Sequence, residues 1–113
     1  MDDALSKIAS NPSASPLYEQ IMSMVEDLAN CEVEVKKTSL HVVHGRAFLG
    51  IHPRRNGLLL NVVTAEPLQS QRLRKTEQVS ANRWHNELLV TDPSDVDGEL
   101  RTWLKQAYLL TER

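Results

Sequence analysis

The dipeptide Asn56-Gly57 constrains the fold more than any other feature of this sequence, because it separates two apolar runs at residues 48–51 and 58–63. Both residues tolerate the positive φ angles of a tight two-residue turn, so this arrangement is the strongest short-range signal for a β-hairpin. A weaker signal of the same kind, His44-Gly45, precedes the first run. The sequence therefore predicts three antiparallel strands over residues 39–64.

With two-residue loops at both turns, the pairing follows from strand geometry, and side chains alternate between two faces. The predicted pairs are Arg55–Leu58, Pro53–Leu60, Ile51–Val62, Val43–Arg46, Val42–Ala47 and Leu40–Leu49. One face is then entirely apolar and carries Leu40, Val42, Ala47, Leu49, Ile51, Leu60 and Val62. The other is mixed and basic and carries His41, Val43, Arg46, Phe48, Gly50, His52, Arg54, Leu59, Asn61 and Val63. This asymmetry is typical of an antiparallel sheet with one side on the core and the other toward solvent or a partner.

Two amphipathic helices are predicted, one on each side of the strands. Ser15-Pro16 is a good helix start, because serine can cap free amides and proline suits the first helical position. The stripe that follows at helical spacing is Leu17, Ile21, Met24, Val25 and Leu28. Ser94 is expected to cap the last helix, whose stripe is Val96, Leu100, Trp103, Leu104, Ala107 and Tyr108.

Further strands are expected over residues 31–35, 77–80 and 84–90, the first of them half-buried and the last two joined by a turn at Ala81-Asn82. Residues 65–75 contain Pro67 and are expected to form a basic loop. Residues 1–15 are predicted to be a flexible leader, and residues 16–113 a single domain. The fold class is therefore α+β: a two-layer sandwich of an antiparallel sheet of about five or six strands, with the N-terminal and C-terminal helices packed on one face.

Charge is segregated along the chain, although the net charge is only −2. Residues 1–35 contain one lysine and seven acidic residues, whereas residues 36–85 contain nine Lys or Arg, two acidic residues and all four histidines. Residues 86–113 are acidic again. A sheet built from the middle block would have a basic side that favours anionic partners. Mutual neutralisation by the acidic helices is the alternative that the sequence leaves open.

No signature of a catalytic or metal site stands out. His41 and His44 have His-x-x-His spacing, and His52 and His85 follow, but no cysteine pair supports a tetrahedral zinc site. Nothing like Gly-x-Ser-x-Gly indicates a nucleophile, and the four scattered glycines form no phosphate-binding loop. We therefore expect no metal and no cofactor. The sequence favours a binding module over an enzyme.

The cellular setting is expected to be cytoplasmic. A single cysteine, Cys31, allows no internal disulfide and is interpreted as a small buried apolar residue, and no apolar signal region is present. No apolar run approaches the roughly 18 residues of a membrane span, so no membrane partner is expected.

Several short motifs, taken together, resemble the domain-of-unknown-function 5655 family. They are Pro16-Leu17-Tyr18-Glu19, Arg46-Ala47-Phe48-Leu49 followed by Pro53 and Asn56-Gly57-Leu58, Trp84-His85, Asp95-Val96-Asp97, Trp103-Leu104 and Ala107-Tyr108. The resemblance runs from Pro16 to Leu110. It implies a bacterial or archaeal accessory module of a kind often fused to other domains, and it implies no activity for particular residues.

The basic face supplies the functional hypothesis. Arginines that fork onto phosphates, with an aromatic residue between them, suit single-stranded nucleic acid. We therefore expect a non-catalytic module that binds an anionic partner, with nucleic acid as the first candidate. Its expected binding residues are Arg46, Phe48, His52, Arg54, Asn61, His41, Arg72 and Arg74.

Two other functions stay open. The first is a protein-interaction or homodimerisation module, in which Phe48, Leu59 and Val63 would form the apolar centre and the arginines its rim. The second is a small enzyme that acts on an anionic substrate with His41 or His52 as general base.

Overall fold

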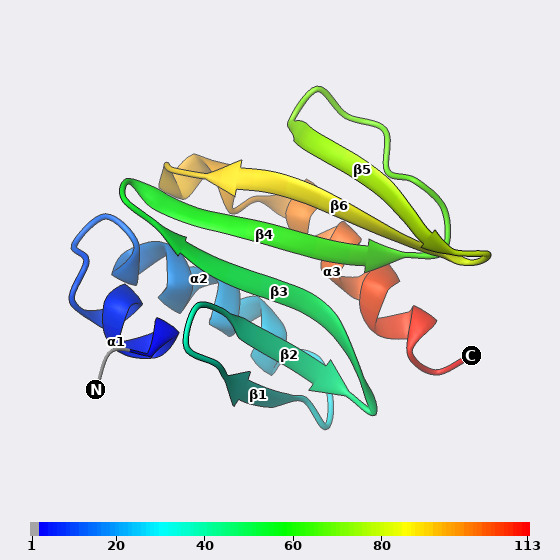
Figure 1. Cartoon of the computed structure of the whole chain (residues 1–113), viewed down its shortest axis with the longest axis horizontal. Coiled ribbons are helices and arrows are strands. Elements are labelled where there is room, and N and C mark those ends of the chain that lie inside the picture. Colours follow the sequence, from blue (N-terminus) through cyan, green and yellow to red (C-terminus); the bar gives the residue numbers. More distant parts are fainter. Residues whose placement is uncertain (1–2) are drawn as a thin grey trace.

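The computed structural model describes residues 3–113 and consists of one six-stranded antiparallel sheet with helices on one side (Figure 1). The elements are α1 (Ala4–Ala9), α2 (Ser15–Glu26), β1 (Glu32–Val35), β2 (Leu40–His44), β3 (Arg46–Arg54), β4 (Gly57–Thr64), β5 (Leu73–Ser80), β6 (Arg83–Val90), the 3₁₀ turn η1 (Pro93–Asp95) and α3 (Gly98–Leu110). The strand order is β1-β2-β3-β4-β6-β5, so the chain leaves β4 for the outer edge and returns as β6 beside β4. These features confirm the predicted α+β sandwich.

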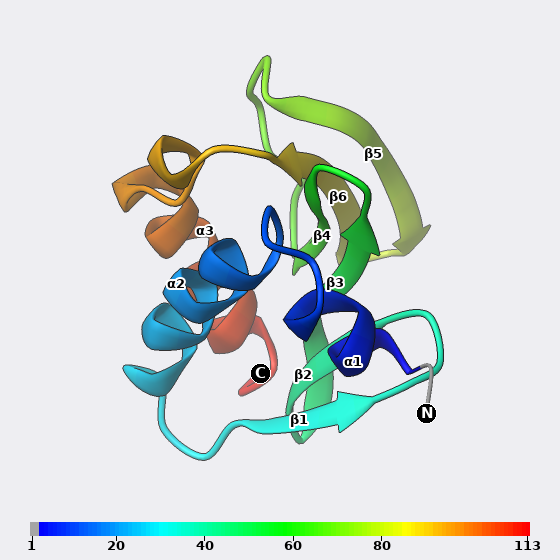
Figure 2. The ribbon, with the colours of Figure 1, turned by 90° about the vertical axis from the view of Figure 1, so that its left-hand side faces the viewer.

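Figure 2 shows the sheet nearly edge-on, with α2 and α3 together on one side of it. We call the opposite side the open face; it carries His41, Gly50, His52, Asn61, His85 and Glu87. No helix between residues 3 and 113 is long and apolar enough to cross a membrane.

The apolar side of the sheet and both helical stripes form one core, as predicted. The buried strand residues include Leu40, Val42, Leu49, Ile51, Leu60 and Val62. The helices contribute Leu17, Ile21, Met24, Val25, Leu100, Trp103, Leu104, Ala107 and Tyr108. A large apolar side chain that is fully buried contributes roughly 1.5–3 kcal/mol to folding, so this core holds the strands as a rigid platform for the open face.

The segment 4–15 is part of this packing and does not form the leader that was expected over residues 1–15. Ala4 and Ile8 of α1 are buried in the core. The side-chain amide of Asn11 donates hydrogen bonds to two backbone carbonyls of the turn between β3 and β4, each at 3.1 Å. Local composition does not reveal these contacts, because their partners lie far away in the sequence. The first two residues are outside the described part of the chain.

The hairpin of β3 and β4 has the predicted faces but not the predicted pairs. Arg54 pairs with Gly57, so the loop is Arg55-Asn56 instead of Asn56-Gly57. Gly57 lies so close to β6 that a Cβ atom there would overlap the carbonyl oxygen of Val90. The pairing is displaced by two residues, and an even displacement leaves every side chain on its expected face.

A β-bulge in the hairpin of β2 and β3 moves Phe48 from the predicted basic face into the core. The pairing register shifts by one residue between Val42 and Val43, which gives β3 an extra residue at this point. Phe48 is completely buried, and its ring lies edge-on to that of Tyr108 with centroids 5.8 Å apart. Ala47, predicted for the core face, is exposed. Both placements were wrong, because an inserted residue breaks the simple alternation.

The two edge strands also differ from the sequence expectations. Every residue of β1 is exposed, although a half-buried strand was predicted there. β5 begins at Leu73, inside the expected loop 65–75, and only that residue is partly covered. The reason is their position, since α1, α2 and α3 make their main sheet contacts with β3 and β4.

Both long helices begin differently from the prediction. Ser15 lies inside α2, and Ala14 precedes it without a side-chain cap. The cap of α3 is Asp97, which accepts a hydrogen bond from the Leu100 N–H at 3.0 Å, and not Ser94.

Candidate functional site

The open face contains a recess of about 240 Å³ that concentrates positive and titratable side chains. It is lined by His41, Arg46, Ala47, Leu49, Gly50, His52, Asn61, Val63, Arg83 and His85. We call it the histidine recess. Four strands contribute to it, namely β2, β3, β4 and β6. In the described part of the chain, no carboxylate is among its lining residues.

Strand pairing places the floor of the recess at Gly50. This residue pairs with His41 on one side and with Asn61 on the other, so the three positions form a row across the sheet. A Cβ atom at Gly50 would lie 3.5 Å from both Asn61 Cβ and His52 Nε2. Because glycine has no side chain, the middle of the row is open and a bound group can approach the backbone closely.

Asn61 and His85 form a polar pair at the wall of the recess. Asn61 Nδ2 lies 3.1 Å from His85 Nδ1, and in this orientation the amide donates and the imidazole proton is on Nε2. Asn61 Oδ1 is buried and accepts no hydrogen bond from residues 3–113. If the amide is rotated, its N–H groups take that place instead. In either orientation one buried polar group of Asn61 lacks a protein partner, which costs roughly 1–3 kcal/mol.

Burial and neighbouring positive charge both disfavour the protonated forms of two side chains in the recess, His52 and Arg83. Burial, followed by the charges of Arg54 and His41, lowers the pKa of His52, while Glu87 has the opposite and smaller effect. Burial and the charge of Arg46 likewise lower the pKa of Arg83. A negative group in the recess would stabilise the charged forms of these side chains.

The recess does not include every histidine of the chain. His44, the fourth histidine, lies outside it and stacks on the Tyr108 ring at 4.4 Å. Its Nδ1 is 3.0 Å from the Asn30 carbonyl and its Nε2 is 3.2 Å from Glu112. Both partners only accept, so this geometry suits the protonated ring. Within residues 3–113, no three His, Cys, Asp or Glu side chains are placed to hold a metal ion.

The structure brings most of the predicted binding residues onto one face. Arg46, His41, His52 and Asn61 line the recess. Arg54 and Arg74 lie at the other end of the open face, beside the turn between β3 and β4. Phe48 is not on this face, because the bulge buries it.

Arg72 is also not on the open face, contrary to the prediction. Its guanidinium donates to Asp97 at 3.1 Å and to Glu99 at 3.0 Å, and it lies 5.4 Å from the centre of the Trp103 ring. It also donates to the Asp95 carbonyl. These contacts attach the segment before β5 to the start of α3, so the role of Arg72 is structural.

Arg83 and His85 were not among the predicted site residues. The sequence predicted that His85 alternates with Trp84 and Asn86 in the last strand, but that strand has apolar residues on both faces, so the pattern did not assign His85 to the open face. It did not show that β6 lies between β4 and β5. That position pairs His85 with Val63 and so brings it next to the histidines of β2 and β3.

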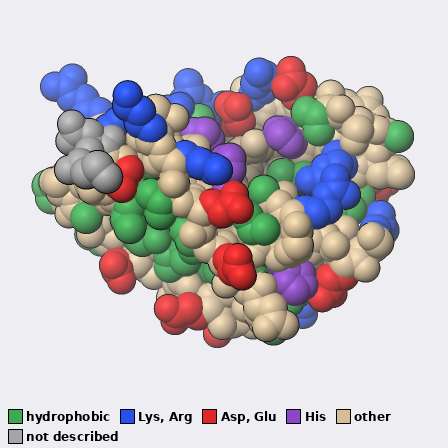
Figure 3. All heavy atoms as spheres, turned by 60° about the horizontal axis from the view of Figure 1, so that its bottom comes forward, with side chains coloured by type: hydrophobic (Ala, Val, Ile, Leu, Met, Phe, Trp, Pro, Cys, Tyr) green, Lys and Arg blue, Asp and Glu red, His purple; other side chains and the backbone are tan. Residues whose placement is uncertain are grey.

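The apolar centre proposed for a protein-interaction surface is not available. Phe48 is in the core, and Leu59 and Val63 are only 8% and 6% exposed. Figure 3 shows the molecule from below the view of Figure 1; Lys, Arg and most His side chains gather in its upper half, and Asp and Glu dominate its lower margin. Acidic side chains also lie among the basic ones in the upper half of this view, so this face keeps the charge segregation of the sequence only in part.

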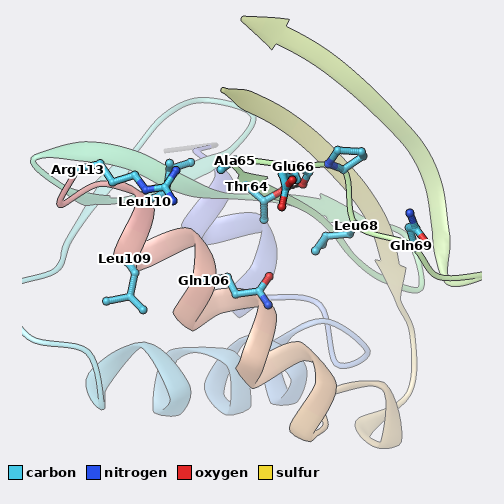
Figure 4. A pocket seen from close by; sticks show the side chains of 10 residues that line it. Thr64, Ala65, Glu66, Leu68, Gln69, Gln106, Leu109, Leu110 and Arg113 are labelled. Atoms are coloured by element: carbon cyan, nitrogen blue, oxygen red, sulfur yellow. Dashed lines mark hydrogen bonds between the residues drawn. The ribbon is translucent and has the colours of Figure 1, made fainter. Parts of the chain in front are cut away.

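A larger hollow, of about 470 Å³, lies between α3 and the segment that follows β4 (Figure 4). Gln106 and Leu109 line it from α3, and Thr64 and Leu68 line it from the end of β4 and the segment that follows. Its described lining contains one acidic and one basic residue and no histidine. It concentrates neither charge nor titratable groups, so the histidine recess is the better candidate site.

A family model described as domain of unknown function (DUF5655) matches residues 1–111. The chain belongs to this family. The match includes every strand, so the histidine recess lies within the DUF5655 domain. No curated protein and no solved structure matches the chain.

Proposed function

We propose that this DUF5655 domain is a binding module whose open face holds an anionic partner, with the phosphate groups of nucleic acid as the candidate ligand. The observation that carries the proposal is the histidine recess, in which two arginines and three histidines surround an open floor without a carboxylate among the described lining residues. Arginine and protonated histidine donate charge-assisted hydrogen bonds to phosphate oxygens. With its amide rotated, so that Nδ2 takes the place of the unpaired Oδ1, Asn61 would donate one further hydrogen bond to a phosphate oxygen.

The recognition would be of phosphate and not of bases. Phe48, the aromatic residue expected to stack on bases, is buried below the sheet. Contacts between arginine and the sugar-phosphate backbone position a nucleic acid without reading its sequence. The affinity should therefore depend weakly on base composition and strongly on salt.

Fluorescence anisotropy with labelled oligonucleotides across a salt series tests the proposal. The key variant is Arg46→Ala/Arg83→Ala, and the matched control is Arg101→Ala/Lys105→Ala, which removes the same charge from exposed positions on α3. We expect the first variant to bind more weakly than wild type. The slope of the logarithm of its binding constant against the logarithm of the salt concentration should be shallower by roughly 0.7 for each lost phosphate contact. Equal behaviour of the two variants would contradict the proposed site.

Imidazole NMR gives an independent readout of the same site. The pKa of His52 is lowered by burial and by neighbouring positive charge, so an anion bound in the recess should raise it. Titration of the protein with inorganic phosphate should show this rise for His52 and leave His44, which is outside the recess, unchanged. A pKa of His52 that does not respond to phosphate would contradict anion binding there.

A small enzyme is the second candidate, and the lowered pKa of His52 supports it. Near neutral pH the lowered pKa favours the unprotonated imidazole, which is the form that a general base requires. Incubation of the protein with RNA, DNA and small phosphate esters tests this function. Cleavage that disappears in His52→Gln and persists in His44→Gln would favour the enzyme over the binding module.

A further inference from the structure

The open face carries a second basic cluster, at the end of the sheet that lies beyond the histidine recess. Arg54, Arg55 and Arg74 line a hollow there, together with Asn56, Gly57, Leu89 and Thr91. Within residues 3–113 the ion pairs of the protein involve none of these three arginines. Lys7 adjoins the same turn, since it lines a neighbouring hollow with Arg54 and Arg55. We call Arg54, Arg55 and Arg74 the turn cluster.

One strand connects the two basic sites. β3 begins at Arg46, in the recess, and ends at Arg54, in the turn cluster. At roughly 3.4 Å per residue, the two arginines are about 27 Å apart along the strand. Arg54 and His52 share the open face, whereas Arg46 lies beyond the bulge, pairs with His44 and reaches the recess from the end of the strand. The arginines of the recess and of the turn cluster are therefore distributed along β3 and do not form one compact cluster.

The carboxylates of the open face flank β3 on both sides. Glu34 of β1 is opposite His41, with Lys36 Nζ 3.8 Å away. Glu87 is opposite Asn61 on β6, and Glu77 is farther out on β5 with Lys75 Nζ 3.9 Å away. No carboxylate is among the described lining residues of the recess or the turn cluster, so an extended anion along β3 would meet cations at both ends and His52 between them. Its most direct path runs over β2, β3 and β4.

We propose, on the basis of the proposed function, that the partner is an extended single strand of nucleic acid whose backbone follows β3. One phosphate enters the histidine recess, and another binds the turn cluster. A span of about 27 Å corresponds to the lower end of the roughly 4–16 nucleotides that single-strand-binding folds cover. A single strand is flexible enough to direct one of its phosphates into the histidine recess, between side chains that are partly buried. A duplex resists such bending, since its persistence length is about 150 base pairs.

Length-dependent binding of labelled oligothymidylates, from roughly two to 12 nucleotides, tests this geometry. Four proteins are compared: wild type, Arg46→Ala/Arg83→Ala, Arg54→Ala/Arg74→Ala, and the control Arg101→Ala/Lys105→Ala. We expect wild-type affinity to rise steeply up to about 4–5 nucleotides, where both sites are reached, and then to level off. The turn-cluster variant should lose this gain, so that its affinity no longer rises between the shortest and the longer oligonucleotides.

The outcomes separate this inference from the proposed function. If short and long oligonucleotides bind equally, and Arg54→Ala/Arg74→Ala matches the control, the extended path is refuted while phosphate binding in the recess stands. If a duplex of the same length binds as tightly as the single strand, the single-strand partner is refuted. If neither oligonucleotides nor inorganic phosphate bind at low salt, both proposals fall. A charge-preserving variant, Arg54→Lys/Arg74→Lys, should recover most of the length dependence, because each lysine still provides a positive charge for a phosphate.

Discussion

Replacing Phe48 by alanine tests the bulge that separates the core from the open face. The Phe48 side chain is fully buried, and truncation of a buried phenylalanine to alanine typically costs about 3–5 kcal/mol. Its edge-on contact with the Tyr108 ring accounts for about 0.5–1.5 kcal/mol of such a loss. Domains of this kind are stable by about 5–15 kcal/mol, so Phe48→Ala is expected to remove a large part of the free energy of unfolding.

Urea unfolding followed by the fluorescence of Trp84 and Trp103 measures the effect. With a denaturant dependence of about 1–3 kcal/mol per molar urea, the midpoint should fall by roughly 2 M. Phe48→Leu, which keeps most of the buried volume, should lower the free energy of unfolding by less than about 1.5 kcal/mol. Leu89→Ala is the matched control, because Leu89 lies on the open face and is 37% exposed. A change below about 0.5 kcal/mol for Phe48→Ala would refute its burial, since substitutions at exposed positions have effects of that size.

The same residue tests how the open face would recognise its ligand. Phe48→Leu should leave oligonucleotide binding unchanged, because the ring lies on the core side of the sheet. If this variant stayed folded and yet lost affinity, Phe48 would have to contact bases directly. The bulged register would then be incorrect.

Two other features yield predictions of their own. The hydrogen bond to the Asn30 carbonyl, and then the contact with Glu112, raise the pKa of His44, against the effect of burial. The stability that this site contributes should be complete below the ordinary pKa of 6.5 and should be lost as pH rises through the raised folded-state pKa. Urea unfolding between about pH 5 and 8 should show a smaller loss in Glu112→Gln than in wild type, and identical pH profiles would contradict the contact. For the glycines, Gly57→Ala should lower the free energy of unfolding by about 1–3 kcal/mol, because its Cβ would overlap the Val90 carbonyl. Gly98→Ala, with nothing within 4 Å of its Cβ at the start of α3, should change it by less than about 1 kcal/mol, and thermal unfolding compares the two.

The elements and faces of this fold follow from patterns that are local in the sequence. Both helical stripes were predicted from periodicity, and the three-stranded segment and its apolar side were predicted from turn residues and alternation; the structure contains all of them, with Ala47 as the exception on the apolar side. His41, His52 and Asn61 were placed on the open face for the same reason, even though the predicted pairs were displaced by two residues. Alternation depends only on the backbone geometry of one strand, so it survives an even error in register.

The composition of the candidate site was decided by tertiary structure. A single inserted residue in β3 buried Phe48, and the packing of α3 drew Arg72 away from the open face. The insertion of β6 between β4 and β5 brought Arg83 and His85 into the recess. Which strands become neighbours, and where a strand takes up an extra residue, depend on how all elements bury their apolar surface together. The sequence by itself therefore determined that one face would be basic and rich in histidine, whereas the fold determined which of those side chains meet.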